Sequence, residues 1–290
     1  MSIVGSRYPS LMSGPLKNCW RSSQGLGARL LGIVMLIAIS TASCGQNAFL
    51  ESAKRDSDAA LLFEAQKLMN KSQWTEAIAK LQLMSATALA KRDAKAALAS
   101  AYAGRCGLNL IAFADAVANA SGNLFPVFLS VMRNSDAQDI SDCISAETTL
   151  LSISEAPESR TANENMLMAF VGWAKIGAIL AVEADTNDDG TADGGWDACT
   201  LSTSLKGEIG TGITISVDSL AETGTSVGGT LSSTIDSVCS SLGASYDFCS
   251  ITDADDFTAD HLRAIGALTK SSDDPGVGTC AGDVSACLCP

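Results

Sequence analysis

Histidine is almost missing from this 290-residue chain, and aromatic residues make up only 5% of it. The single histidine, His261, excludes zinc sites built from several histidines and leaves any Ser-His-Asp arrangement with one possible base. It stands at the expected start of an exposed helix, which is typical of an ordinary surface histidine. The scarcity of aromatic rings argues against a platform that stacks on sugars or bases.

Basic residues are also in short supply, because 19 lysines and arginines face 32 acidic residues. Four of the basic residues and none of the acidic ones precede residue 44, so the rest of the chain carries a net charge of about −17. Nucleic-acid binding draws its affinity from Lys and Arg side chains that neutralise phosphates. The charge excludes DNA and RNA as partners and argues against electrostatic attachment to anionic lipid.

The N-terminal segment has the features of an export signal. A basic region is followed from Leu30 by the apolar run LLGIVMLIAISTAS and then by Cys44. This run is too short to span a bilayer, and its length and flanks are typical of a signal peptide. The small residues Ala42 and Ser43 before Cys44 resemble the lipobox of bacterial lipoproteins, although Thr41 stands where an aliphatic residue is usual.

The lipobox resemblance implies that residues 1–43 are removed and that Cys44 carries the lipid anchor. Gly45 takes the place of the aspartate that signals inner-membrane retention, which implies the outer membrane, with the protein facing the periplasm or the cell surface. The alternative is an ordinary secretory signal cut nearby, with Cys44 as one more disulfide cysteine.

An even set of eight cysteines follows Cys44. In an oxidising compartment such a set predicts up to four disulfides, and the sequence leaves 105 possible pairings open. The last three could instead bind a metal through their thiolates, but the compartment favours disulfides. The eight are Cys106, Cys143, Cys199, Cys239, Cys249, Cys280, Cys287 and Cys289.

Hydrophobic spacing predicts an all-α fold, in which antiparallel helical hairpins surround a buried central helix and a disulfide-rich, irregular portion follows. Residues 44–56 are expected to be a tether, 57–198 a helical domain, and 199–290 a region rich in Cys, Ser, Thr and Gly that packs on it. The expected helices span residues 57–70, 74–84, 93–111, 124–132, 135–153, 163–183 and 258–270.

Two charged positions carry specific expectations. The helix over 163–183 is apolar nearly all round, but placing the charged Lys175 from its middle in lipid would be unfavourable in free energy. We therefore expect a buried helix of a soluble core, with Lys175 reaching the surface along its aliphatic stem. In the helix over 74–84, Glu76 and Lys80 are expected to form an exposed pair one turn apart.

The first helices resemble a tetratricopeptide repeat. Ala65, Ala77, Ala99 and Tyr102 occur where that pattern places three small residues and an aromatic one. The resemblance covers residues 58–102 and lacks the usual early Trp and late Pro. Any alanine-rich helical hairpin is the alternative and predicts the same fold class.

The sequence DTNDDGTAD, directly after the central helix, resembles EF-hand loops and the shorter D-x-[DN]-x-D-G-x-x-D loops of extracellular proteins. Oxygen donors at alternate positions can converge on Ca²⁺, and glycine at the sixth position permits the sharp turn. Trp196 replaces the bidentate Glu of an EF-hand, which favours the shorter form and a structural role. The alternative is a solvated acidic turn that binds nothing. The expected ligands are Asp185, Asn187, Asp189, Thr191 and Asp193.

We therefore expect a non-enzymatic, lipid-anchored envelope protein that acts as a helical scaffold or adaptor for another envelope protein or peptide. One alternative is a structural or surface-exposed lipoprotein, stabilised by calcium and disulfides, whose Ser/Thr-rich end faces outward. A hydrolase that uses His261 is the third hypothesis.

Overall fold

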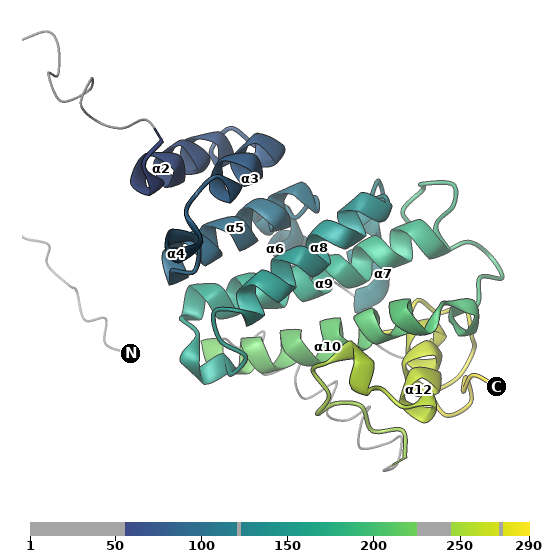
Figure 1. Cartoon of the computed structure of the whole chain (residues 1–290). Helices are drawn as coiled ribbons and strands as arrows, with labels where there is room; N and C mark the ends of the chain where they lie inside the picture. The colour runs from purple at the N-terminus through teal and green to yellow at the C-terminus, as the bar shows by residue number, and fades with distance from the viewer. Residues whose placement is uncertain (1–55, 121–122, 225–244, 273–274) are drawn as a thin grey trace, which may run out of the picture. The chain divides into compact units, whose positions relative to one another are not determined.

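A computed structural model of the chain describes residues 56–120, 123–224, 245–272 and 275–290. Within these ranges the backbone is helical, and the extended pairing consists of an isolated bridge between Ser271 and Cys280. The all-α fold class is therefore confirmed (Figure 1). The helices are α2 (Asp58–Met69), α3 (Trp74–Gln82), α4 (Ala86–Leu89), α5 (Arg92–Arg105), α6 (Leu110–Ala118), α7 (Leu124–Met132), α8 (Ala137–Leu151), α9 (Ala162–Ala184), α10 (Thr203–Thr223) and α12 (Ala259–Lys270), with 3₁₀ turns η1 (Pro157–Ser159), η2 (Ala198–Thr200) and η3 (Ala254–Asp256).

The helices α2 and α3 form an antiparallel hairpin. The Ser57 side chain caps α2 by accepting a hydrogen bond from the Ala60 N–H. The Asp58 carboxylate accepts hydrogen bonds from the Ser85 N–H and Oγ at 2.7 and 2.8 Å, which joins the start of α2 to the residues that follow α3. The expected Glu76–Lys80 pair is wrong: Lys80 pairs with Glu64 across the hairpin at 2.9 Å, because the partner helix offers a closer carboxylate.

Helix α5 joins two hydrophobic cores. Ala94, Ala97 and Ala101 pack in a small core with the hairpin, whereas Ala99 and Ala103 belong to the main core. Because alanine side chains are small, other helices can pack closely against both faces of α5. The helix expected over 93–111 is interrupted, because the chain turns at Gly107 (φ 94°) and resumes as α6.

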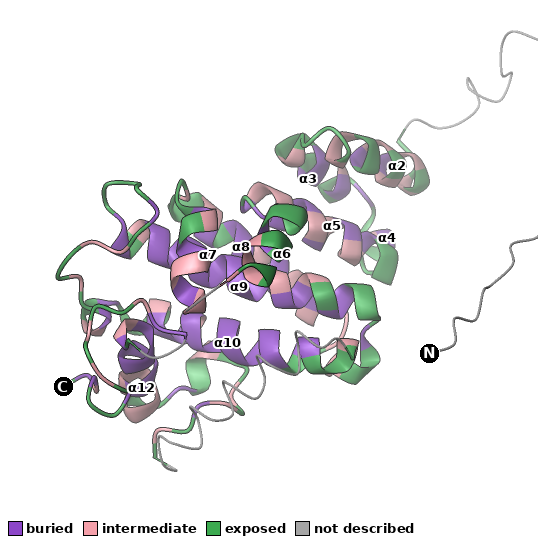
Figure 2. Cartoon of the chain, turned by 180° about the vertical axis from the view of Figure 1, so that it is seen from behind, coloured by how far each residue is buried: buried purple, intermediate pink, exposed green. Residues whose placement is uncertain are grey.

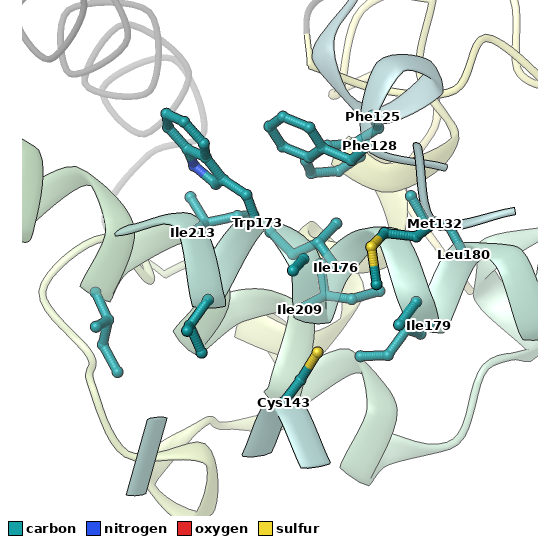
Figure 3. Packing of buried hydrophobic residues seen from close by; sticks show 14 of the residues in the cluster. Phe125, Phe128, Met132, Cys143, Trp173, Ile176, Ile179, Leu180, Ile209 and Ile213 are labelled. Atoms are coloured by element: carbon teal, nitrogen blue, oxygen red, sulfur yellow. The ribbon is translucent and has the colours of Figure 1, made fainter. Parts of the chain in front are cut away.

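Helix α9 is the centre of the main core, as expected from its apolar sequence. It packs against α7, α8 and α10, and Figure 2 shows it buried along most of its length. Among the described residues it is the one helix long and apolar enough to cross a membrane, and 78% of its most apolar 18-residue stretch is buried inside the protein. Trp173 and Ile176 of α9 pack with Phe128 of α7 (Figure 3).

Helix α10 was not expected, because its sequence is rich in Ser, Thr and Gly and shows little apolar periodicity. It forms because its small side chains let it approach α9 closely. A Cβ added at Gly172 of α9 would lie 2.8 Å from the carbonyl oxygen of Gly212 in α10, so no larger residue fits at this crossing. Nearby, the Ser216 Oγ donates a hydrogen bond to the Ala169 carbonyl across the same contact at 2.9 Å.

Three disulfides join described cysteines: Cys106–Cys143, Cys199–Cys289 and Cys280–Cys287. The first ties α5 to α8, and the second ties η2 to the segment after α12. Cys249 is also disulfide-bonded, and Cys239 lies outside the described residues. The disulfide prediction is confirmed for these cysteines, and the alternative of a metal at the last three is wrong, since each of those sulfurs is in a disulfide.

Candidate functional site

The predicted calcium loop begins where α9 ends. Asp185 is the C-cap residue of α9 and is buried, as is Gly190, while residues 186–189 and Thr191 are exposed. Gly190 has a φ of 85°, which explains the glycine at the sixth position of the motif. The loop therefore has the sharp turn that the sequence pattern predicts.

Carboxylate oxygens of the loop accept hydrogen bonds from the loop itself. Asp185 accepts from the N–H groups of Asp189 and Gly190 at 3.0 and 2.7 Å. Asp189 accepts from Thr191, which lowers the pKa of the Asp189 carboxyl. Asp193 accepts from Thr186 at 3.0 Å. Within the described part of the chain, no three His, Cys, Asp or Glu side chains are grouped to hold a metal ion, so calcium binding stays a prediction.

Two other predicted sites have different outcomes. Cys44 lies outside the described residues, so lipidation stays a prediction. His261 occupies the third position of α12 and its Nδ1 accepts a hydrogen bond from the Thr258 N–H at 3.2 Å, while the Thr258 Oγ1 accepts from the His261 N–H. This reciprocal arrangement is a capping box, which gives His261 a structural role at the helix start.

The expectation for Lys175 is wrong. Lys175 is 0% exposed, and its Nζ lies inside the helical core. It donates hydrogen bonds to Glu147 of α8 at 2.7 Å, to Glu208 of α10 at 2.7 Å and to the Thr211 hydroxyl at 2.8 Å. The aliphatic stem could not carry the ammonium group to solvent because α8 and α10 cover this side of α9. Two carboxylates compensate for the desolvation of the charge instead.

One oxygen of this cluster has no partner. Glu147 is 6% exposed, and its Oε2 makes no hydrogen bond while Oε1 binds Lys175. Burial raises the pKa of the Glu147 carboxyl, and Lys175 opposes that shift. Local sequence patterns do not reveal the cluster, because Glu147 and Glu208 are 28 and 33 positions away from Lys175. The one signal in the sequence is a lysine in an apolar helix.

A cavity of about 380 Å³ lies beside the cluster, between α8, α10, η1 and η3. Glu147 and Glu208 line it together with Arg160, which precedes α9 and is 7% exposed. The Arg160 Nη2 donates to the Ser219 Oγ at 3.3 Å, whereas its Nε and Nη1 have no hydrogen-bond partner. Burial lowers the pKa of the Arg160 guanidinium, and the nearby Asp218 opposes that shift.

A second, shallower depression also lies along α8 and shares Ile144 and Thr148 with the cavity. This groove, of about 610 Å³, is bounded by α4, α5 and α8. Its walls combine aliphatic side chains such as Leu89 and Leu98 with the hydroxyl groups of Thr148 and Thr149. Lys95 is the one charged residue that lines it, and its Nζ donates to the Ser152 carbonyl at 2.5 Å.

The sequence also contains G-x-S-x-G at residues 224–228, the pattern of hydrolase nucleophile elbows. In such an elbow the serine lies between a strand and a helix. Here the first glycine, Gly224, has a φ of 65° and ends helix α10, and Ser226 lies outside the described residues. The pattern therefore lacks the preceding strand that a hydrolase assignment requires.

Comparison with known proteins gives no further guide to this site. No protein-family model, no curated protein and no solved structure matches the chain.

Proposed function

We propose that this chain is a lipid-anchored, non-enzymatic protein of a bacterial outer membrane that holds an uncharged, largely aliphatic segment of another envelope protein. The groove between α4, α5 and α8 carries this proposal. A mixed aliphatic and hydroxyl lining suits an extended or helical segment, because it offers both apolar contact and hydrogen bonds.

Charge supports the choice of occupant. The groove is lined by one charged side chain, Lys95, although the chain from residue 44 onward carries a net charge of about −17. A strongly basic segment would find no acidic partner in the groove, whereas an uncharged aliphatic segment leaves Lys95 in its hydrogen bond to the Ser152 carbonyl. The small core of the hairpin and α5 is separate from the main core. The groove residues on α4 and α5 therefore pack against the small core.

The test is site-specific photo-crosslinking in envelopes of the native host. A photoreactive residue at Thr149, which lines the groove, is expected to crosslink one envelope protein, and the same residue at Ile111, which is exposed on α6, is expected not to. Leu98→Glu should abolish the Thr149 crosslink, because it introduces a charged carboxylate into the apolar wall. Equal crosslinking at both positions, or persistence in Leu98→Glu, would contradict the proposal.

Anchoring is tested separately by intact-mass analysis of the mature protein extracted from membranes. A mature N-terminus at Cys44 that carries acyl mass, absent from Cys44→Ser, is the expected result. An unlipidated chain cut at another residue would make the protein a freely secreted or periplasmic one.

A second candidate function is a structural or surface-exposed lipoprotein stabilised by calcium and disulfides. The ordered turn of the predicted loop, with Gly190 at positive φ, favours it, and so do the disulfides of the C-terminal region. Calcium at about 1 mM is expected to raise the Tm of the wild type and of Asp188→Asn, a control outside the ligand positions, but not of Asp189→Asn. Equal calcium responses of the two variants would exclude the loop as the binding site.

A further inference from the structure

The cavity beside Lys175 contains two buried polar side chains, each with hydrogen-bonding atoms that have no partner. Arg160 and Glu147 are each more than nine-tenths buried, and both line the cavity. The Arg160 Nε and Nη1 need an acceptor, and the Glu147 Oε2 needs a donor. Leaving such groups unpaired is unfavourable, so their retention in one cavity points to a ligand that completes their hydrogen bonds.

The charge of the cavity restricts what that ligand can be. Arg160 is the one basic residue that lines it, and the acidic side chains there are Glu147, Glu155, Glu208, Asp218 and Asp253. Of these acidic side chains, Lys175 binds Glu147 and Glu208, so the lining keeps a net negative charge after this pairing. A cavity with one sign of charge concentrates the opposite ion, which favours a ligand with a cationic group.

Neither a simple amine nor a dicarboxylic acid fits the whole lining. An amine would satisfy the acidic side chains and leave the Arg160 Nε and Nη1 without an acceptor. A dicarboxylic acid would place a second negative charge against the acidic wall. A ligand with one carboxylate and one ammonium group satisfies both, since a guanidinium binds a planar carboxylate through paired N–H groups.

The rest of the lining indicates the remaining part of the ligand. Ile144, Leu151 and Ile215 contribute aliphatic surface beside the polar groups. This surface would pack against an aliphatic side chain, whose burial favours binding. The volume of about 380 Å³ leaves room for a molecule of the size of leucine together with ordered water.

We propose that this cavity binds a free α-amino acid with an aliphatic side chain, its carboxylate at Arg160, its ammonium group at the acidic wall and its side chain against Ile215. The cavity and the groove share Ile144 and Thr148 of α8, but Arg160 and the acidic wall line the cavity alone. The adaptor function can therefore hold or fail without amino-acid binding. Binding would couple α8, η1 and α10, because the lining comes from all three.

The test is calorimetric titration of the full chain, purified in detergent with its disulfides intact, with three matched probes. L-leucine carries both charged groups, 4-methylpentanoate lacks the ammonium group, and 3-methylbutan-1-amine lacks the carboxylate. L-leucine is expected to bind at least tenfold more tightly than either of the other two, since each lost charge contact is worth 1.4 kcal/mol or more. No binding of L-leucine at 10 mM, or equal affinity for the three probes, would overturn the proposal.

Variants at Arg160 assign the carboxylate contact. Arg160→Gln is expected to reduce L-leucine affinity to that of the amine and to leave the amine affinity unchanged. Arg133→Gln, at an exposed arginine that does not line the cavity, should change neither. Two buried nitrogens of Arg160, Nε and Nη1, have no hydrogen-bond partner in the unliganded protein. Unliganded Arg160→Gln should therefore unfold at the same temperature as the wild type or higher. If Arg160→Gln and Arg160→Lys both fold and both bind L-leucine with unchanged affinity, the assignment of the ligand carboxylate to Arg160 is refuted.

Discussion

At the scale of single residues, the buried ammonium group of Lys175 is the most consequential charge in the fold. It lies where three helices meet and neutralises carboxylates from α8 and α10. A buried ion pair costs desolvation on both sides, so its net contribution is small while both partners are present. Removing one partner is different, because the other charge is then left buried and unpaired.

Lys175→Met is therefore expected to destabilise the protein by about 3–5 kcal/mol at neutral pH. The deficit arises mainly at Glu147, whose folded-state pKa burial already raises above its ordinary value. A raised carboxyl pKa means that protonation favours the folded state, so the deficit should shrink as the pH falls through that pKa. Urea unfolding at several pH values measures this, and Lys95→Met, at the groove, serves as the control for loss of one lysine. A deficit independent of pH would contradict this account.

At the scale of elements, the start of α9 is fixed by a capping box that also contacts α5. The Glu164 side chain accepts hydrogen bonds from the Thr161 N–H and Oγ1 at 2.7 and 2.8 Å, and the Arg92 Nε donates to it at 2.8 Å. These contacts lower the pKa of Glu164 from 4.5 to about 2, with the Arg92 hydrogen bond as the largest cause. One carboxylate thus sets both where α9 begins and how α5 lies against it.

The lowered pKa of Glu164 predicts a specific pH dependence. A depressed carboxyl pKa contributes stability above the unfolded-state value and loses it as the pH falls from about 4.5 towards 2. Glu164→Gln is expected to cost about 1 kcal/mol at pH 7 and to lose less stability than the wild type between pH 5 and pH 2.5. Tm measured across that range tests it, with Glu158→Gln, at an exposed neighbouring acid, as control. Parallel wild-type and Glu164→Gln curves would refute this role.

At the scale of the whole molecule, the described disulfides close loops of very different lengths. Cys199 and Cys289 are 90 positions apart, and Cys280 and Cys287 are 7 apart. A cross-link restricts the unfolded chain more when it closes a longer loop. The longer bond should therefore contribute more to stability.

Replacing Cys199 and Cys289 together by serine is expected to cost about 2 kcal/mol more than replacing Cys280 and Cys287. The pair Cys106 and Cys143, which are 37 positions apart, should fall between them. Urea unfolding of the three double variants in oxidising buffer gives the order. A reversed order would show that local packing at the sulfurs, rather than loop length, determines their contribution.

The sequence was most informative where apolar periodicity is strong and local. The bounds of α7, the Ser57 cap and the buried α9 were predicted, because each depends on neighbouring residues. Helix α10 was missed because close backbone packing at Gly212 takes the place of an apolar stripe. The partners of Lys175 and the cavity at Arg160 depend on contacts between residues far apart in sequence, which local patterns do not encode.

The position of Lys175 has a further consequence for the proposed export of the chain. A translocation channel releases sufficiently apolar segments sideways into the bilayer, and α9 passes the length and composition criteria for such a segment. A lysine at the centre of a helix opposes that release by about 2.5–3.5 kcal/mol. The residue that later neutralises two carboxylates in the folded core would thus first direct α9 through the membrane instead of into it.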